Sequence, residues 1–236
     1  MARLPRVIGL DLPHHVTQRG NARRFILDGD THRRIYMDLL TQSLRLHAVA
    51  LIGYCLMSNH VHLILIPRKA ESLGLALKHA HGRFASYWNA VHHACGHVWQ
   101  GRYYSCPLDE THLWEALRYT ELNPVRARLT ENPEDWDWSS AAAHCETAPA
   151  GDSLEMDLWR KRWSPQTWRA FLGQKESETE LTAIRQSTHT GRPLGTKEFV
   201  HSLERSTQRR LAPAKRGRPR RTAPDSRQTL LPLELV

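Results

Sequence analysis

Apolar residues recur every three to four positions in several stretches of the first part of the chain. This period predicts helices over residues 30–46 and 71–94, each with one buried face. A third helix is predicted over residues 109–122, and its first residue is an aspartate that can cap the helix. For the helix over 30–46 we expect Asp30 or Thr31 to provide the cap.

Other stretches have the composition and alternation of β-strands. Residues 47–56 and 60–67 are two apolar runs joined by a very short connection, which predicts an antiparallel hairpin. Shorter strands are predicted over residues 13–19 and 102–106. The resulting order β-α-β-β-α-β predicts an α+β fold of the ferredoxin-like, split βαβ type, with a central antiparallel sheet and one extra helix.

The composition changes after residue 145, where apolar residues become fewer and positive charge increases. Residues 1–145 carry 16 Lys and Arg against 13 Asp and Glu, whereas the rest of the chain carries 17 against 11. We therefore predict a main domain over 1–145, a linker over 146–163, a small helical extension of the DNA-binding type over 164–211 and a basic, partly disordered tail over 212–236.

The charge of the whole chain restricts the classes of partner. The formal net charge is +9 and the pI is about 9.8, so a polyanion, most simply nucleic acid, is the expected partner. No apolar run approaches the roughly 18 residues that span a bilayer, and no signal peptide precedes the first strand. We expect no membrane partner and a cytoplasmic, nucleoid-associated protein.

Two histidines in the second strand of the predicted hairpin are the first candidate site. His60 and His62 lie two positions apart, so in a strand both side chains point to the same face. Two imidazoles at this spacing can bind one divalent metal ion, or they can lie on the solvated face of the sheet. On the predicted helix 109–122, Tyr119 is followed four positions later by Asn123. The pair can supply a nucleophile and a metal ligand, or Tyr119 can pack in the core while Asn123 starts the next helical turn.

Several segments resemble one family of enzymes. The string MSNHVHLIL at 57–65 resembles the HUH motif (histidine, hydrophobic residue, histidine) of the single-tyrosine transposases. The strings HVTQRGN at 15–21, VWQGRYYSC at 98–106 and YTELNPVR at 119–126 resemble further stretches of that family, in the same order. Within the family, the chain resembles the REP-associated tyrosine transposases, and the resemblance covers most of residues 5–145.

The resemblance implies a function for each candidate residue. His60 and His62 would be metal ligands, Asn123 the third ligand and Tyr119 the nucleophile, with Mg²⁺ or Mn²⁺ as the ion. Family members cleave single-stranded DNA near a hairpin, form a 5′-phosphotyrosine and rejoin the strand to another 3′-OH. Both monomeric and helix-exchanged dimeric relatives exist, so the resemblance leaves the oligomeric state open.

Arginines near these segments are the expected DNA contacts, because single-stranded DNA binding needs cations that follow the phosphates. We predict this role for Arg19, Arg23, Arg24, Arg102, Arg118, Arg126, Arg128, Arg216 and Arg218. An alternative function is a non-catalytic regulatory protein that binds DNA hairpins on the same fold. A third hypothesis, an RNA-binding protein, is disfavoured because the central strands lack exposed aromatic residues.

Overall fold

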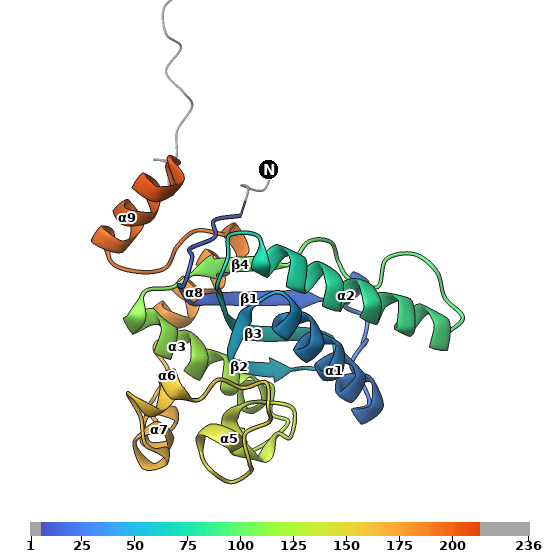
Figure 1. The fold of residues 1–236 in the computed structure, drawn as a ribbon. Helices are drawn as coiled ribbons and strands as arrows, with labels where there is room; N and C mark the ends of the chain where they lie inside the picture. Colours follow the sequence, from blue (N-terminus) through green and yellow to red (C-terminus); the bar gives the residue numbers. More distant parts are fainter. Residues whose placement is uncertain (1–5, 213–236) are drawn as a thin grey trace, which may run out of the picture.

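A central antiparallel sheet organises the computed structural model, which describes residues 6–212 (Figure 1). Within these residues the sheet has four strands: β1 (His14–Arg19), β2 (Val49–Leu56), β3 (His60–Pro67) and β4 (Tyr104–Pro107). The strands follow the order β2-β3-β1-β4, and all neighbours are antiparallel. This order confirms the predicted ferredoxin-like arrangement, and β2 and β3 form the predicted hairpin.

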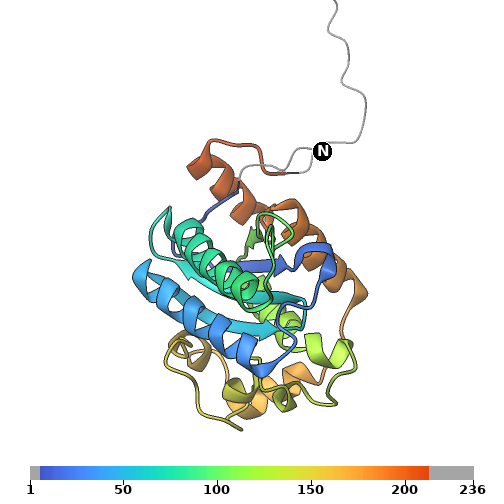
Figure 2. The ribbon, with the colours of Figure 1, turned by 90° about the vertical axis from the view of Figure 1, so that its right-hand side faces the viewer.

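Alternate residues of β3 belong to different cores. Val61, Leu63 and Leu65 pack in one hydrophobic cluster with α1 (Asp30–Leu46) and α2 (Ser72–Val91). Figures 1 and 2 show these two helices side by side on one face of the sheet. The other residues of β3, beginning with His60, face the opposite side, as the period of two requires.

The cap of α1 differs from the prediction. Gly29, with extended backbone, precedes the helix, and no side chain caps it. Asp30 is the first helical residue, and its carboxylate accepts a hydrogen bond from Trp138 Nε1 at 2.9 Å. The Asp30 side chain, which we expected to cap the helix, therefore makes a tertiary contact instead.

The helix α3 (Glu110–Glu121) lies on the second face of the sheet. Asp109 caps it as predicted, because its Oδ1 accepts a hydrogen bond from His112 N at 2.9 Å. Leu117 of α3 contacts the strand at Gly53, where an added Cβ would lie 2.1 Å from Leu117 Cδ1. The glycine therefore lets the helix approach β2 closely.

Packing is continuous across residue 145, where we predicted a domain boundary. The short helices α4 (Asn123–Arg126), α5 (Ala141–His144), α6 (Asp157–Arg160) and α7 (Pro165–Leu172) follow α3, and 3₁₀ turns occur at Asn21–Arg23 and Pro133–Asp135. Trp159 and Trp168 are fully buried in the same cluster as Ile52 and Ile64 of the sheet. Residues predicted as linker and extension thus contribute to the core of the main domain.

The last described helices are α8 (Glu178–Thr190) and α9 (Lys197–Thr207). α8 packs against β4, and Leu194, just after it, exchanges backbone hydrogen bonds with the end of that strand. α9 belongs to a separate small cluster with Val7 and Leu211. Within residues 6–212 no helix combines the length and hydrophobicity needed to cross a membrane. Most of the predicted basic tail, with Arg216 and Arg218, lies outside the described residues.

Candidate active site

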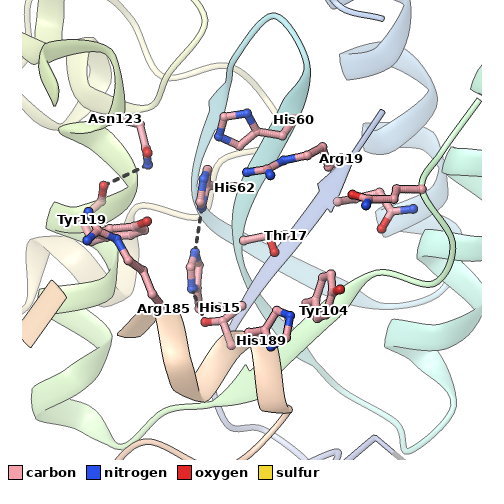
Figure 3. Close-up of a pocket in the computed structure, with 13 residues that line it drawn as sticks. His15, Thr17, Arg19, His60, His62, Tyr104, Tyr119, Asn123, Arg185 and His189 are labelled. Carbon is pink, nitrogen blue, oxygen red and sulfur yellow. Dashed lines mark hydrogen bonds between the residues drawn. The ribbon is translucent and has the colours of Figure 1, made fainter. Parts of the chain in front are cut away.

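A pocket of about 330 Å³ opens on the face of the sheet that carries α3 (Figure 3). The strands β1, β3 and β4, the C-terminal end of α3 and the helix α8 contribute its walls. The predicted site residues among its lining are His60, His62, Tyr119, Asn123 and Arg19. Lining residues that we did not predict include His15, Thr17, Tyr104, Arg185, Thr188 and His189.

Strand register explains why the polar side chains meet here. Thr17 of β1 lies opposite His62 of β3 and opposite Tyr104 of β4, and Arg19 lies opposite His60. Directly opposed residues of antiparallel strands point to the same face. Because side chains alternate between the two faces along each strand, these polar side chains form one cluster on a sheet face that is otherwise apolar.

His60 and His62 both have Nδ1 engaged in a hydrogen bond. His60 Nδ1 lies 2.6 Å from Asn59 Oδ1, and His62 Nδ1 lies 3.0 Å from His15 Nε2. The two ring centroids are 5.0 Å apart. Because the Nδ1 atoms are engaged, the Nε2 atoms are the ones left to bind a ligand.

Burial keeps these imidazoles neutral. It lowers the pKa of His60 to about 4, with a smaller contribution from nearby Arg19. It also lowers the pKa of His62 well below its usual value, and the neighbouring His60 and His15 add to this effect. A neutral imidazole has a lone pair available, so the electrostatics suit a bound cation.

Tyr119 lies beside the histidines, with its side chain extending from α3 towards His62 and His15 (Figure 3). Its ring meets the rings of His62 and His15 edge-on, at centroid distances of 5.5 and 5.7 Å. The Arg126 guanidinium lies 4.3 Å from the centroid of the Tyr119 ring, and Arg126 Nη2 donates to the Tyr119 carbonyl oxygen. Leu181 and Ile184 of α8 pack in one cluster with the ring.

Asn123 follows the end of α3. Its Nδ2 donates to the carbonyl oxygens of Tyr119 and Thr120, at 3.0 and 3.1 Å. The side chain thus satisfies carbonyl groups that the end of a helix leaves unpaired. Asn123 is the first residue of α4, so it starts the next helical turn as our alternative stated, although Leu122 and not Asn123 takes the N-cap position. The amide oxygen, an acceptor, is left for a ligand in the pocket.

The pocket carries side chains of the types that bind divalent metal ions. In the described part of the chain, no group of three or more His, Cys, Asp or Glu side chains is placed to hold a metal. The candidate donors in this pocket are two imidazole nitrogens and one amide oxygen, from His60, His62 and Asn123. Such a set leaves coordination positions open for phosphate or water.

A comparison with protein families decides the class of this domain. Residues 10–123 match the family described as "Transposase IS200 like". This segment belongs to the IS200-like transposases. The matched range contains His60, His62, Tyr119 and Asn123, and it ends at the last of them. No curated protein matches the chain.

Solved structures resemble the transposase domain in fold. A REP-associated tyrosine transposase bound to a REP hairpin superposes with a TM-score of 0.55 at 16% identity, over 66% of this chain and 96% of the other. A putative transposase from Deinococcus radiodurans R1 is 18% identical, with a TM-score of 0.36, over 55% and 94% of the respective chains. The first likeness shows that the fold is shared.

Several arginines that we predicted as DNA contacts are exposed. Arg19 is exposed at the pocket. The other exposed arginines of the predicted set are Arg23, Arg24, Arg102 and Arg128. Arg24 Cζ lies 5.2 Å from the ring centroid of Trp88, a buried residue of α2.

Arg118 and Arg126 have internal roles instead. Arg118 is buried, its Nη2 donates to the Gln174 carbonyl oxygen, and its guanidinium packs on Phe171. The prediction that Arg118 binds DNA is therefore wrong, because its position on α3 points it into the core. Arg126 Nη1 pairs with Glu176 Oε1 at 2.6 Å, and its Nη2 donates to the Tyr119 carbonyl oxygen. Both terminal nitrogens of this guanidinium therefore bind groups of the protein itself.

Sequence reasoning missed His15 and the contribution of α8 to the transposase site. His15 shares its strand face with Thr17 and Arg19, so the period of two, once the strand register is known, identifies it. Thr188 lies 173 residues from His15, and no spacing in the sequence relates the two.

Proposed function

We propose that this transposase cleaves and rejoins single-stranded or hairpin DNA through a covalent bond between Tyr119 and DNA. The carrying observation is that Tyr119 lies edge-on to His62, at 5.5 Å, in a pocket that one chain forms. The family match and a similar fold bound to a REP hairpin support a DNA substrate.

In the proposed reaction the Tyr119 oxygen attacks a backbone phosphorus. The phosphorus–O3′ bond breaks, which leaves a 5′-phosphotyrosine and a free 3′-OH. The phenolic proton is lost to solvent, and the leaving 3′-oxygen takes up a proton. Attack by another 3′-OH reverses the step, so strand transfer needs no water and no nucleotide hydrolysis.

Other residues of the pocket prepare the substrate. His60, His62 and Asn123 would hold Mg²⁺ or Mn²⁺, and a bound ion would stabilise negative charge on the phosphate oxygens. Arg19 and Arg185 line the same pocket and supply positive charge for the phosphates on either side. Tyr104 and His189 stack with centroids 5.1 Å apart and form a further wall.

The decisive experiment is a covalent-adduct assay. Labelled single strands from hairpins that flank the gene are incubated with the full chain and Mg²⁺, Mn²⁺ or EDTA. We expect a metal-dependent adduct that Tyr119→Phe abolishes while hairpin binding persists. Tyr104→Phe is the matched control, since it removes the other tyrosine hydroxyl of the pocket and should leave the adduct in place.

The outcomes separate the two functions that the sequence left open. An adduct that survives in Tyr119→Phe and disappears in Tyr104→Phe would assign the nucleophile to the other tyrosine. Hairpin binding that EDTA does not change, with no adduct from any strand, would support the non-catalytic DNA-binding protein.

A further inference from the structure

A chain of hydrogen bonds joins α8 to the histidines of the pocket. Thr188 Oγ1 lies 2.8 Å from His15 Nδ1, and His15 Nε2 lies 3.0 Å from His62 Nδ1 (Figure 3 draws the second of these bonds). The imidazole planes of His15 and His62 are only 10° apart. Thr188, His15 and His62 are all buried, so water does not compete for these bonds.

Ligand binding through His62 Nε2 fixes the imidazole protons of both histidines in this series of hydrogen bonds. A neutral His62 that binds through Nε2 carries its proton on Nδ1 and donates it to His15 Nε2. His15 Nε2 must then be an acceptor, so the His15 proton lies on Nδ1 and is donated to Thr188 Oγ1. In each of these two hydrogen bonds, one donor then faces one acceptor.

α8 is fixed in place at the end that carries Thr188. After the helix, Leu194 N donates to the Pro107 carbonyl oxygen at 2.9 Å, and the Asp109 amide donates to the Leu194 carbonyl oxygen at 3.2 Å. Thr196 N then donates to Asp109 Oδ2 at 2.8 Å. These contacts tie the segment after α8 to the residue that caps α3.

We propose that His15 and Thr188 are positioning residues that hold His62 with its Nε2 towards the pocket. α8 lies beyond the segment matched by the family, and through Thr188 it then helps to orient His62. This inference rests on the proposed metal site at His60, His62 and Asn123. Partners of this kind orient metal-binding imidazoles and raise their affinity for the ion.

The test measures Mn²⁺ affinity of the full chain by electron paramagnetic resonance, without DNA. His15→Phe keeps the ring volume and removes the acceptor, so we expect Mn²⁺ binding to weaken by about 10- to 100-fold. His15→Gln restores an acceptor and should recover most of the affinity. Thr188→Val keeps the shape of the side chain and should weaken binding by roughly three- to tenfold.

Thr190→Val is the matched control on the same helix. Thr190 is exposed and its hydroxyl donates to the Gln186 carbonyl oxygen within α8, so this variant should bind Mn²⁺ like the wild type. A second readout is the tautomer of His62 in ¹H–¹⁵N spectra of the metal-free chain. We expect the Nδ1–H form in the wild type and in His15→Gln, and a shift towards Nε2–H in His15→Phe.

The possible results test the metal site and the positioning role separately. Wild-type Mn²⁺ binding that His62→Ala abolishes but that Thr188→Val and His15→Phe leave unchanged would overturn the positioning role alone. A wild-type chain that binds no Mn²⁺ would overturn both the metal site and the inference drawn from it. If Thr190→Val weakened binding as much as Thr188→Val, the effect would belong to the helix and the hydrogen-bond chain would be refuted.

Discussion

Glu121, at the end of α3, is a fully buried carboxylate within reach of several donors. Its Oε1 lies 2.6 Å from Ser140 Oγ and 2.5 Å from His144 Nδ1, and its Oε2 accepts from Trp168 Nε1 at 2.9 Å. These bonds connect α3 with α5 and α7. Two positions from Tyr119, they fix the end of the helix that carries the proposed nucleophile.

Removal of this carboxylate should destabilise the fold strongly. We expect Glu121→Leu to lower the free energy of unfolding by about 3 kcal/mol or more, because it leaves buried polar partners without an acceptor. Urea denaturation followed by circular dichroism measures the change. Asp28→Asn is the matched control, since Asp28 also faces a histidine Nδ1, at 3.1 Å, but at the surface.

For the control we expect a change of about 1 kcal/mol or less, as for exposed ion pairs in general. Equal losses in the two variants would show that burial adds nothing to the interaction of Glu121. The adduct assay on the folded fraction of Glu121→Leu then tells whether the network also positions Tyr119.

At the same scale, the sequence predicted part of the candidate site. His60, His62, Tyr119 and Asn123 were found from local spacing and from family resemblance, and the structure brings them to one pocket. Thr188 and Glu121 were not found because their partners are distant in sequence. Burial in a folded core, which no local pattern reports, gives these residues their roles.

Among the elements, α3 packs closely on β2 at Gly53. The sheet accommodates Leu117 only because residue 53 has no side chain, and Ser140 Oγ lies on the same side, 3.0 Å from an added Cβ. α3 also carries Tyr119, so the depth at which the helix packs sets the distance between Tyr119 and the histidines of β3.

Two glycine substitutions test this contact. Gly53→Ala should lower the free energy of unfolding by about 1–3 kcal/mol through overpacking, and it should reduce adduct formation if α3 moves outwards. Gly82→Ala, on the exposed side of α2, meets nothing within 4 Å and should instead stabilise the chain by about 0.5–1 kcal/mol. Thermal and urea denaturation measure both. A Gly53→Ala protein as stable as the wild type would show that Leu117 repacks freely.

The elements that the sequence predicted are those whose pattern is local. α1, α2, α3 and the β2–β3 hairpin follow from their periods, with ends within a few residues of those expected. The short helices α5 and α6 have too few turns for a period, and they form where tertiary packing buries them. For the same reason, the thinner apolar content after residue 145 did not show that Trp159 and Trp168 complete the core.

For the molecule as a whole, buried neutral histidines make stability depend on pH. Burial lowers the pKa of His14 to about 4 and that of His81 to about 3. His14 Nε2 accepts a hydrogen bond from Gly9 N at 3.2 Å while His14 Nδ1 donates to the Leu12 carbonyl oxygen, an arrangement that only the neutral ring allows. His81 Nε2 lies 3.1 Å from the Tyr36 hydroxyl oxygen.

The sign of the effect follows from proton uptake. Histidines of the unfolded chain titrate near pH 6.5. Below that pH they bind protons, whereas the buried His14 and His81 of the folded chain stay neutral down to about their lowered pKa values. Stability should therefore be greatest above about pH 6.5 and should fall as the pH drops towards 4. Each such histidine contributes a slope of up to about 1.4 kcal/mol per pH unit.

Urea unfolding between pH 5 and 7.5 measures this slope. His81→Gln should make it shallower by about one proton. A slope that is identical in wild type and His81→Gln would contradict the assignment of His81 as a neutral buried ring.

The order in which a ribosome makes this chain has a consequence for the pocket. Its walls come from β1, β3 and α3 and, last, from Arg185, Thr188 and His189 of α8. A nascent chain that has emerged only as far as Asn123 contains the whole segment matched by the family, but Tyr119 still lacks its cover of Leu181 and Ile184. The pocket therefore forms fully only after residue 190 has left the ribosome. A product that terminates before α8 lacks this wall of the pocket and the apolar cover of Tyr119.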